Sequence, residues 1–254
     1  MQRKYPRIIA TTDDYLVVYK DHGVPFHAER EQDGRKTGRP GILQILRDME
    51  SEGAIASGAR LYPVHRLDQV TSGLLVFARG RKNANLLSNE FRHRRVTKFY
   101  LALSDRRPKK KQGRVSGDMT RGRRGGWILT RTHKNPAVTN FLSKSVPGAR
   151  PGLRLYLLRP RTGKTHQLRV AMKSLGAPIL GDGLYGRFDL AREEDRAYLH
   201  AYGLEFKLGG NTVRLIEAPD AGHEFSTPAF RKALREYADP FQIFKSDRSE
   251  VAER

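Results

Sequence analysis

Short apolar runs, each bounded by charged or turn-forming residues, recur along the chain and predict a protein rich in β-strands. Four of these runs contain β-branched or aromatic residues and have the length of single strands. They are 15–19 (YLVVY), 73–78 (GLLVFA), 99–103 (FYLAL) and 153–158 (LRLYLL). We therefore expect strands at these four positions.

Three other stretches place apolar residues at spacings of three and four, which predicts amphipathic helices. The first is 82–94, whose apolar face is Ala84, Leu87 and Phe91. The second has Thr165 as its expected N-cap, Gly176 as its stop, and the apolar face Leu168, Ala171, Met172 and Leu175. The third follows an N-cap at Thr227 and a proline at position 228, with Phe230, Leu234 and Tyr237 on its face.

The segments between these elements are polar. We expect 28–40 to be a surface loop and 106–124, where nine residues are Lys or Arg and one is acidic, to be a mobile or hairpin-like basic loop. No internal repeat is present, so we expect one domain over 1–240 with the basic loop inserted in it, followed by a loosely held polar tail over 241–254. Strands that outnumber helices favour an α+β fold on a mixed, mainly antiparallel sheet with flanking helices.

Charge adds the first indication of a partner. The 254 residues include 48 Lys and Arg but only 27 Asp and Glu, a formal net charge of +21. Such a field attracts polyanions, of which nucleic acid is the commonest, and a purely architectural RNA-binding protein would show the same charge. Because the chain has no cysteine, disulfides, thiol catalysis, iron–sulfur clusters and cysteine-ligated zinc are excluded. We find no apolar run of membrane-spanning length and no secretory signal, and we expect a soluble, cytoplasmic protein.

Polar side chains gather directly before the apolar run at 73–78. The segment begins His65-Arg66-Leu67-Asp68 and continues through Thr71 and Ser72 into that run. A carboxylate and a guanidinium at the mouth of a buried strand are placed by rigid backbone, which suits a functional site. The alternative is an aspartate that caps a turn, with solvated His65 and Arg66 beside it.

A second polar segment, 159–169, contains Gly163-Lys164-Thr165 at the start of an expected helix. The full phosphate-binding loop needs a glycine where Leu158 stands, so a nucleoside triphosphatase is disfavoured. An RNA phosphate at the helix amides and a simple capped helix both remain open. The eight histidines lack metal-ligand spacing and have no acid-rich cluster beside them, so we expect no metal site. Asp182, the other candidate carboxylate, is equally well interpreted as a turn residue, so we expect Asp68 to act without a second acid.

Four segments resemble, in order and spacing, the motifs of the RluA-type pseudouridine synthases. The central one is His65-Arg66-Leu67-Asp68-x-x-Thr71-Ser72-Gly73-Leu74-Leu75. The others are 13–20 with Gly23 and His27, 96–102, and 162–169 followed by 176–186; a weaker match includes 199–201. The chain departs from the family pattern at Asp21, Lys164 and Ala171, where the family usually has Pro, Arg and His. The resemblance does not include an N-terminal S4-type domain, for which we find no room before Asp13.

The resemblance implies an α+β pseudouridine synthase domain that isomerises uridine in ribosomal or transfer RNA. The N1–C1′ bond breaks, the base rotates and C5 joins C1′, so no cofactor, nucleotide or metal is expected. By resemblance Asp68 is the carboxylate that acts at C1′, and Arg169 pairs with it. Tyr100 is the tyrosine that stacks on the uracil and is a candidate to accept the C5 proton.

The resemblance also implies a role in RNA binding for the positively charged residues. Arg66 would fill the space left by the flipped base. The remaining candidates for RNA or base contact are His65, Thr71, Lys98, Lys164, His166, Arg92, Arg95, Lys109, Lys110 and Lys111. We expect a monomer whose partner is RNA, with no membrane and no obligatory protein partner. A non-catalytic RNA-binding protein on the same fold is the alternative, and a metal-dependent nuclease lacks the acidic cluster it needs.

Overall fold

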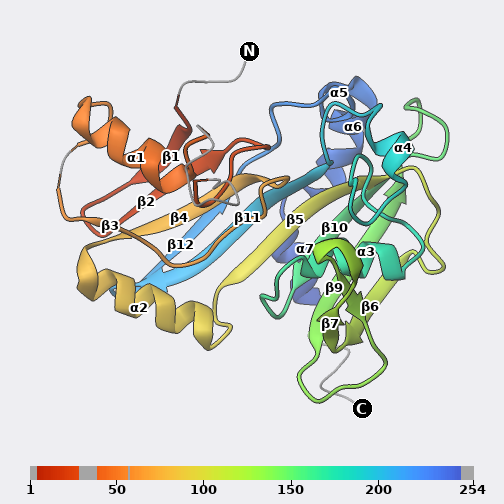
Figure 1. Ribbon diagram of the computed structural model, residues 1–254, viewed down its shortest axis with the longest axis horizontal. Helices are drawn as coiled ribbons and strands as arrows, with labels where there is room; N and C mark the ends of the chain where they lie inside the picture. The colour runs from red at the N-terminus through yellow and green to blue at the C-terminus, as the bar shows by residue number, and fades with distance from the viewer. Residues whose placement is uncertain (1–4, 29–38, 57, 247–254) are drawn as a thin grey trace. The chain divides into compact units, whose positions relative to one another are not determined.

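The computed structural model describes residues 5–28, 39–56 and 58–246 and divides into two compact units (Figure 1). Unit 1 consists of Met1–Thr97 and Leu204–Glu217, and unit 2 of Lys98–Gly203 and Ala218–Arg254. Strand β11 (Leu199–Leu208) gives its first half to unit 2 and its second half to unit 1. Helices beside a mainly antiparallel sheet confirm the α+β fold class.

The sheet of unit 1 has the strand order β1-β2-β4-β11, with β3 on β4 and β12 on β11. The strands are β1 (Arg7–Thr11), β2 (Tyr15–Lys20), β3 (Leu61–Pro63), β4 (Ser72–Arg79) and β12 (Asn211–Ile216). The helices are α1 (Ile42–Ser51) and α2 (Gly80–Arg92). Every residue of β4 is buried, and α2 packs on it through Ala84 and Leu87. The polar segment before β4 therefore starts from a rigid strand.

The sheet of unit 2 continues in the order β11-β5-β10-β9-β6. Its strands are β5 (Thr97–Ser104), β6 (Gln112–Gly117), β9 (Ala137–Ser145) and β10 (Arg154–Pro160), and β7 (Met119–Arg121) pairs with β8 (Trp127–Leu129) in a separate two-stranded sheet. The helices are α3 (Gln167–Ser174), α4 (Phe188–Ala191), α5 (His223–Ser226), α6 (Pro228–Leu234) and α7 (Pro240–Ser246), with 3₁₀ turns η1 (Arg123–Gly125) and η2 (Arg235–Tyr237).

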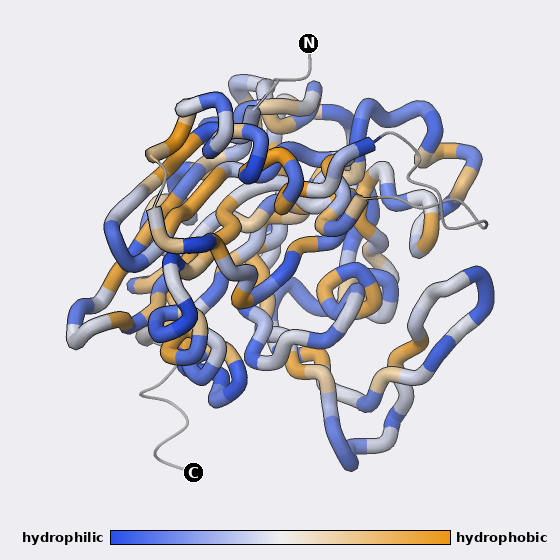
Figure 2. The backbone as a smooth tube through the Cα atoms, turned by 60° about the vertical axis from the view of Figure 1, so that its left-hand side comes forward, coloured by the Kyte–Doolittle hydropathy of each residue, from blue (hydrophilic) through white to orange (hydrophobic). Residues whose placement is uncertain are grey.

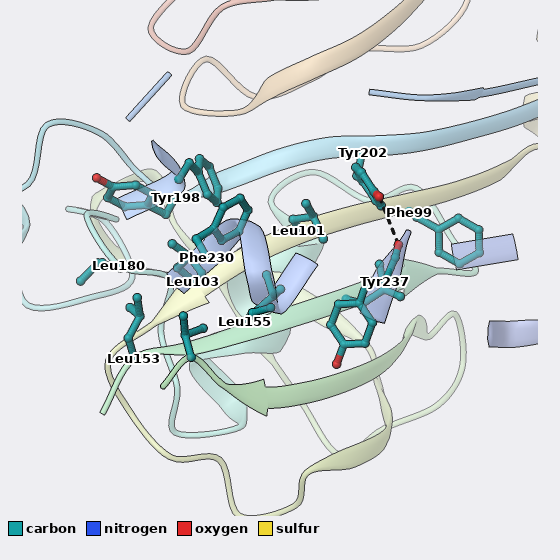
Figure 3. Packing of buried hydrophobic residues seen from close by; sticks show 14 of the residues in the cluster. Phe99, Leu101, Leu103, Leu153, Leu155, Leu180, Tyr198, Tyr202, Phe230 and Tyr237 are labelled. Atoms are coloured by element: carbon teal, nitrogen blue, oxygen red, sulfur yellow. Dashed lines mark hydrogen bonds between the residues drawn. The ribbon is translucent and has the colours of Figure 1, made fainter. Parts of the chain in front are cut away.

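Alternation along β5 gives unit 2 a core on each face of its sheet. Phe99, Leu101 and Leu103 point to one face, where they meet α6 and α7 (Figure 3). On this face the Tyr202 hydroxyl donates to the Tyr237 carbonyl oxygen at 3.1 Å. Successive strand residues point to opposite faces, so Tyr100 and Ala102 lie on the other face, with the apolar side of α3. Figure 2 shows apolar stretches of the tube separated by hydrophilic ones, as this alternation of buried elements and polar turns requires.

Most of the predicted elements are confirmed. The four expected strands are β2, β4, β5 and β10, and the first expected helix is α2. Helix α6 starts as predicted, with Pro228 in its first turn and the Phe230 amide donating to Thr227 Oγ1 at 3.1 Å. Thr165 as the cap of α3 is wrong. The N-cap is His166 in a left-handed conformation with φ of 57°, and no side chain caps this helix.

The basic segment 106–124 is more regular than predicted. It contains β6, which pairs antiparallel with β9, and β7, which forms a hairpin with β8. The hairpin-like part of the prediction is confirmed, but the expectation of a loop rather than regular strands is wrong. Only Val115 and Gly117 of β6 are buried, so pairing with a distant strand, rather than an apolar pattern, determines this element.

The region after Pro240 also differs from the prediction of a loosely held tail. Residues 240–246 form α7, and Phe241 and Phe244 are buried against Phe99. Two aromatic residues three apart were enough to attach this short helix to the core of unit 2. Residues 247–254 lie outside the described residues, as do 29–38 of the loop expected at 28–40.

Candidate active site

Asp68 lies in the irregular segment between β3 and β4 of unit 1. It is half-buried, and its carbonyl oxygen accepts from the Thr71 amide at 3.0 Å, which closes a turn. Leu67 on one side and Thr71 on the other are buried in the core. The carboxylate is therefore carried by a short turn whose two ends are fixed by packing. Because Thr71 is only 2% exposed, its contribution is to this turn.

Lys20, at the end of β2, supports the same turn from within the unit. It is fully buried, and its ammonium donates to the carbonyl oxygens of Asp21 at 2.9 Å, Val24 at 2.8 Å and Gln69 at 3.2 Å. The Gly23 amide also donates to the Gln69 carbonyl at 2.8 Å. The residue after Asp68 is thus bonded to the 21–24 loop. No role for Lys20 was predicted from the sequence, because only the fold brings it to Gln69.

His65 and Arg66 differ in their surroundings, although they are neighbours in the sequence. Nε2 of His65 accepts from the Val76 amide at 3.1 Å, and the ring stacks on Phe91 with centroids 4.6 Å apart. The guanidinium carbon of Arg66 lies 5.8 Å from the centroid of the Phe26 ring, and Arg66 is exposed. Of the two, Arg66 is the one presented to solvent, while His65 is oriented by β4 and α2.

Tyr100 and Lys98 lie two residues apart on β5 and therefore share one face of the unit 2 sheet. Tyr100 is half-buried, stands opposite Leu158 of β10 and packs against the cluster that includes α3. The Lys98 ammonium lies next to Gly163, on which an added Cβ would be 3.6 Å from Nζ. Burial disfavours its charged form and lowers the pKa of Lys98 to about 8.

Arg169 projects from α3 and is buried together with Asp182. Its Nε donates to Asp182 Oδ2 at 2.7 Å and its Nη2 to Oδ1 at 2.8 Å, a bidentate ion pair. The Asp182 Oδ1 atom also accepts from the amides of Leu184 at 3.0 Å and Tyr185 at 3.2 Å. The turn interpretation of Asp182 is confirmed, but its partner Arg169 was not foreseen. The pairing of Arg169 with Asp68 stays a prediction.

Around the start of α3, side chains make several of the local contacts. Gln167 accepts from the Thr162 hydroxyl at 2.6 Å and the Lys164 amide at 3.0 Å, and donates to the Val138 carbonyl oxygen at 3.0 Å. The Lys164 ammonium donates to the Asn135 carbonyl. Nδ1 of His166 is hydrogen-bonded to the Tyr185 hydroxyl at 2.9 Å. Gln167 was not among the predicted residues, yet it joins this turn to β9.

The remaining basic candidates lie on exposed surface of their own units. In unit 1, Arg92 ends α2, and Arg95 forms an ion pair with Glu90 in which Nη2 and Oε1 are 2.5 Å apart. In unit 2, the three lysines at 109–111 are exposed in the turn before β6. Arg121, at the end of β7, holds its guanidinium 4.7 Å from the centroid of the Trp127 ring.

Across 5–28, 39–56 and 58–246 there is no group of three or more His, Cys, Asp or Glu side chains that could hold a metal ion. Among the same residues, no helix has the length and apolar character needed to cross a membrane.

Comparisons with known proteins agree with one another. The family model described as RNA pseudouridylate synthase matches residues 14–174. An uncharacterized RNA pseudouridine synthase of Haemophilus influenzae is 40% identical over 230 residues, 91% of this chain and 95% of the relative. Ribosomal large subunit pseudouridine synthase D of Borreliella burgdorferi is 32% identical over 72% of this chain and 51% of its own length. Ribosomal large subunit pseudouridine synthase C of Rickettsia bellii is also 32% identical, over 80% of this chain and 68% of its own.

Two solved structures share the fold. Human RNA pseudouridylate synthase domain containing 1 superposes with a TM-score of 0.66 at 26% identity, over 92% of this chain and 98% of the other. Human RNA pseudouridylate synthase domain containing 4 gives a TM-score of 0.67 at 24% identity, over 90% and 92% of the two chains. The α+β architecture described above is therefore one that known proteins adopt.

Proposed function

This chain belongs to the RNA pseudouridylate synthase family and is an isomerase that acts on RNA, and from that premise we propose that it converts specific uridines of ribosomal RNA, or transfer RNA, to pseudouridine with Asp68 as its catalytic carboxylate. The observation that carries the proposal is the position of Asp68. It lies within the matched residues, on a turn that Lys20 and the buried strand β4 hold in place.

The proposed reaction divides the chemical work among three residues. Breaking the N1–C1′ bond leaves positive charge at C1′, which the Asp68 carboxylate meets as nucleophile or electrostatic partner. By the family resemblance, Arg169 acts together with Asp68 on the bound uridine. After the base rotates and C5 bonds to C1′, the C5 proton leaves, and Tyr100, stacked on the uracil, is the group proposed to accept it.

Ribosomal RNA is the substrate that the comparisons favour. The relatives from Borreliella burgdorferi and Rickettsia bellii are both named for pseudouridine formation in the large ribosomal subunit. The basic residues supply affinity for its phosphates, which is largely independent of sequence. Arg66, exposed next to the Asp68 turn, takes the space vacated by the flipped base. The proposed phosphate and base contacts are Lys98, Lys164, His166, Arg92, Arg95, Lys109, Lys110 and Lys111, with His65 and Thr71 supporting the turn.

The variant Asp68→Asn tests this proposal, because it removes the charge and keeps the shape of the side chain. The substrate is ribosomal RNA from a bacterial strain that lacks this chain, labelled with tritium at C5 of uridine. Wild-type protein should release tritium and form pseudouridine, whereas Asp68→Asn should do neither. Its dissociation constant for the same RNA should stay within about threefold of wild type, since phosphate contacts supply most of the affinity.

The control is Asp13→Asn, which removes an equal charge from an exposed position of unit 1. This variant should keep wild-type activity. Pseudouridine formation by Asp68→Asn would overturn the catalytic assignment. Wild-type protein that binds RNA but modifies none of it would instead support a non-catalytic RNA-binding protein on the same fold.

A further inference from the structure

The Arg169–Asp182 pair is more completely buried than a surface ion pair and more specific in geometry. The side chains of Arg169 and Asp182 are 7% and 1% exposed. Removing two charges from water costs several kcal/mol per ion before the attraction between them is counted, so such a pair is a poor source of stability. What a bidentate pair does fix is the orientation of the guanidinium, because both oxygens of the carboxylate bind one edge of this planar group.

Asp182 can fix the orientation of Arg169 because backbone hydrogen bonds hold Asp182 in place. It stands in the 179–182 turn, where its amide donates to the Ile179 carbonyl oxygen at 3.1 Å. Two amides, those of Leu184 and Tyr185, donate to its Oδ1. The carboxylate oxygens therefore have fixed positions before Arg169 is considered. Rotation of the Asp182 side chain would break two backbone hydrogen bonds as well as the ion pair.

Tyr185 fixes the plane of the guanidinium. The Arg169 guanidinium carbon lies 4.9 Å from the centroid of the Tyr185 ring, within the range of a cation–π contact. The Tyr185 hydroxyl in turn accepts from the Trp127 amide at 2.9 Å and is bonded to His166 Nδ1. The ring is thereby held from two sides, by the start of β8 and by the residue that precedes α3.

We propose that Asp182 and Tyr185 are positioning residues that orient the Arg169 guanidinium for the isomerisation. Asp182 binds the guanidinium edge that carries Nε and Nη2, and so determines which edge is left for the substrate. Tyr185 determines the plane of the same guanidinium. This inference rests on the proposed function, in which Arg169 acts together with Asp68 on the bound uridine. Neither Asp182 nor Tyr185 needs to touch the RNA.

Two variants each remove one of these constraints. Asp182→Asn keeps an acceptor for the Leu184 and Tyr185 amides but loses the charge and the bidentate geometry. Tyr185→Phe keeps the ring against the guanidinium but loses the hydroxyl that holds it. Single-turnover tritium release with enzyme in excess over labelled ribosomal RNA gives the maximal rate constant and the half-saturating enzyme concentration separately.

We expect Asp182→Asn to lower the maximal rate constant by about tenfold to a hundredfold, the range for a misplacement of about 1 Å, and to leave half-saturation within threefold. Tyr185→Phe should lower the same constant by a smaller factor. A loss confined to the maximal rate constant is the readout that a purely structural role would not produce.

The matched control is Asp189→Asn, at the start of α4, where Arg187 and Asp189 form an exposed ion pair. It should leave both constants unchanged. The proposal is overturned if Asp182→Asn and Tyr185→Phe, both shown to be folded by their thermal melting curves, have wild-type rate constants, or if their losses appear only in half-saturation. If Asp182→Asn does not fold, Tyr185→Phe decides alone.

The two proposals fail in different ways. Active wild-type protein, inactive Asp68→Asn, and fully active Asp182→Asn and Tyr185→Phe would end the positioning proposal and leave the proposed function intact. Wild-type protein without pseudouridine formation would end the proposed function, and the positioning proposal with it.

Discussion

At the scale of single residues, the structure separates side chains that share a motif by what each one contacts. Lys20, His65 and Thr71 all belong to the segments that resemble the family motifs, and each is committed to contacts inside unit 1. Arg66 is exposed in the same unit. Resemblance groups these residues because they occur together in the sequence. The contacts divide them into one that is exposed and three that are bonded or buried inside unit 1.

Lys98 gives a prediction at this scale. Its pKa is lowered from 10.5 to about 8, so between these values the unfolded chain binds a proton that the folded chain has released. Stability from this group therefore rises as the pH increases from about 8 towards 10.5, and below about 8 its burial is a constant cost. Lys98→Met removes the cost, so the variant should be more stable than wild type at neutral pH. That advantage should shrink as the pH approaches 10.5.

Urea unfolding of both proteins across this pH range measures the difference. Lys109→Met, at an exposed lysine, is the control, and its difference from wild type should not depend on pH. A pH-independent difference for Lys98→Met would show that the Lys98 ammonium keeps its ordinary pKa in the folded protein.

At the scale of elements, turns that place functional side chains depend on glycine at specific positions. Gly176, which ends α3, and Gly181, which precedes Asp182, have nearly equal φ values of 74° and 75°. An added Cβ at Gly176 would meet nothing within 4 Å, but at Gly181 it would lie 1.9 Å from the Arg196 carbonyl oxygen. The two positions therefore share the conformational strain of a substitution and differ only in the space available.

Alanine at these two glycines separates strain from steric overlap. Gly176→Ala should lower the free energy of unfolding by about 1–2 kcal/mol, the cost of a left-handed conformation. Gly181→Ala should cost clearly more, because the backbone at Arg196 must move. Denaturant melts give both values. Equal losses in the two variants would show that the turn before Asp182 shifts without resistance.

Elements whose buried faces repeat regularly were predictable from the sequence. The strand at 73–78 is an apolar run, and α2 has Ala84 and Leu87 at a helical spacing. Strand β6 could not be predicted, since QGRVSG carries one apolar residue and depends on pairing with β9. For α7, the sequence held only Phe241 and Phe244, whose burial depends on packing against Phe99.

The residues of the candidate site were predictable to the same extent, through local sequence patterns but not through contacts between distant residues. Asp68 and Arg169 were found through motifs, whose residues lie close together in the sequence. Asp182 was interpreted equally well as a candidate carboxylate and as a turn residue. Its ion pair with Arg169, 13 positions earlier, could not be predicted because it exists only once α3 and the turn are folded. Gln167 and Tyr185 were missed for the same reason. Their partners Val138 and Trp127 lie on β9 and β8, far from them in the sequence.

At the scale of the whole molecule, the net charge of +21 predicts RNA binding that weakens steeply with salt. In the β7–β8 hairpin, Arg121, Arg123 and Arg124 are all exposed. If each meets one phosphate, replacing the three by alanine should reduce the slope of log affinity against log salt by about 2–3. Filter binding to ribosomal RNA over a range of salt concentrations measures the slope.

An equal change in charge elsewhere provides the control. Arg231, Lys232 and Arg235 are exposed on α6 and η2, and their triple alanine variant should alter the slope by less. If the two triple variants alter it equally, the general field of the protein, rather than the hairpin, holds the RNA.

The bond between the Trp127 amide and the Tyr185 hydroxyl also has a spectroscopic consequence. Trp127 is the single tryptophan of the chain, and its indole lies against the Arg121 guanidinium. Indole fluorescence therefore originates at one place, where the hairpin meets the tyrosine that packs on Arg169. The protein carries its own optical probe there, and a change in emission when RNA binds would report on that junction without any attached dye.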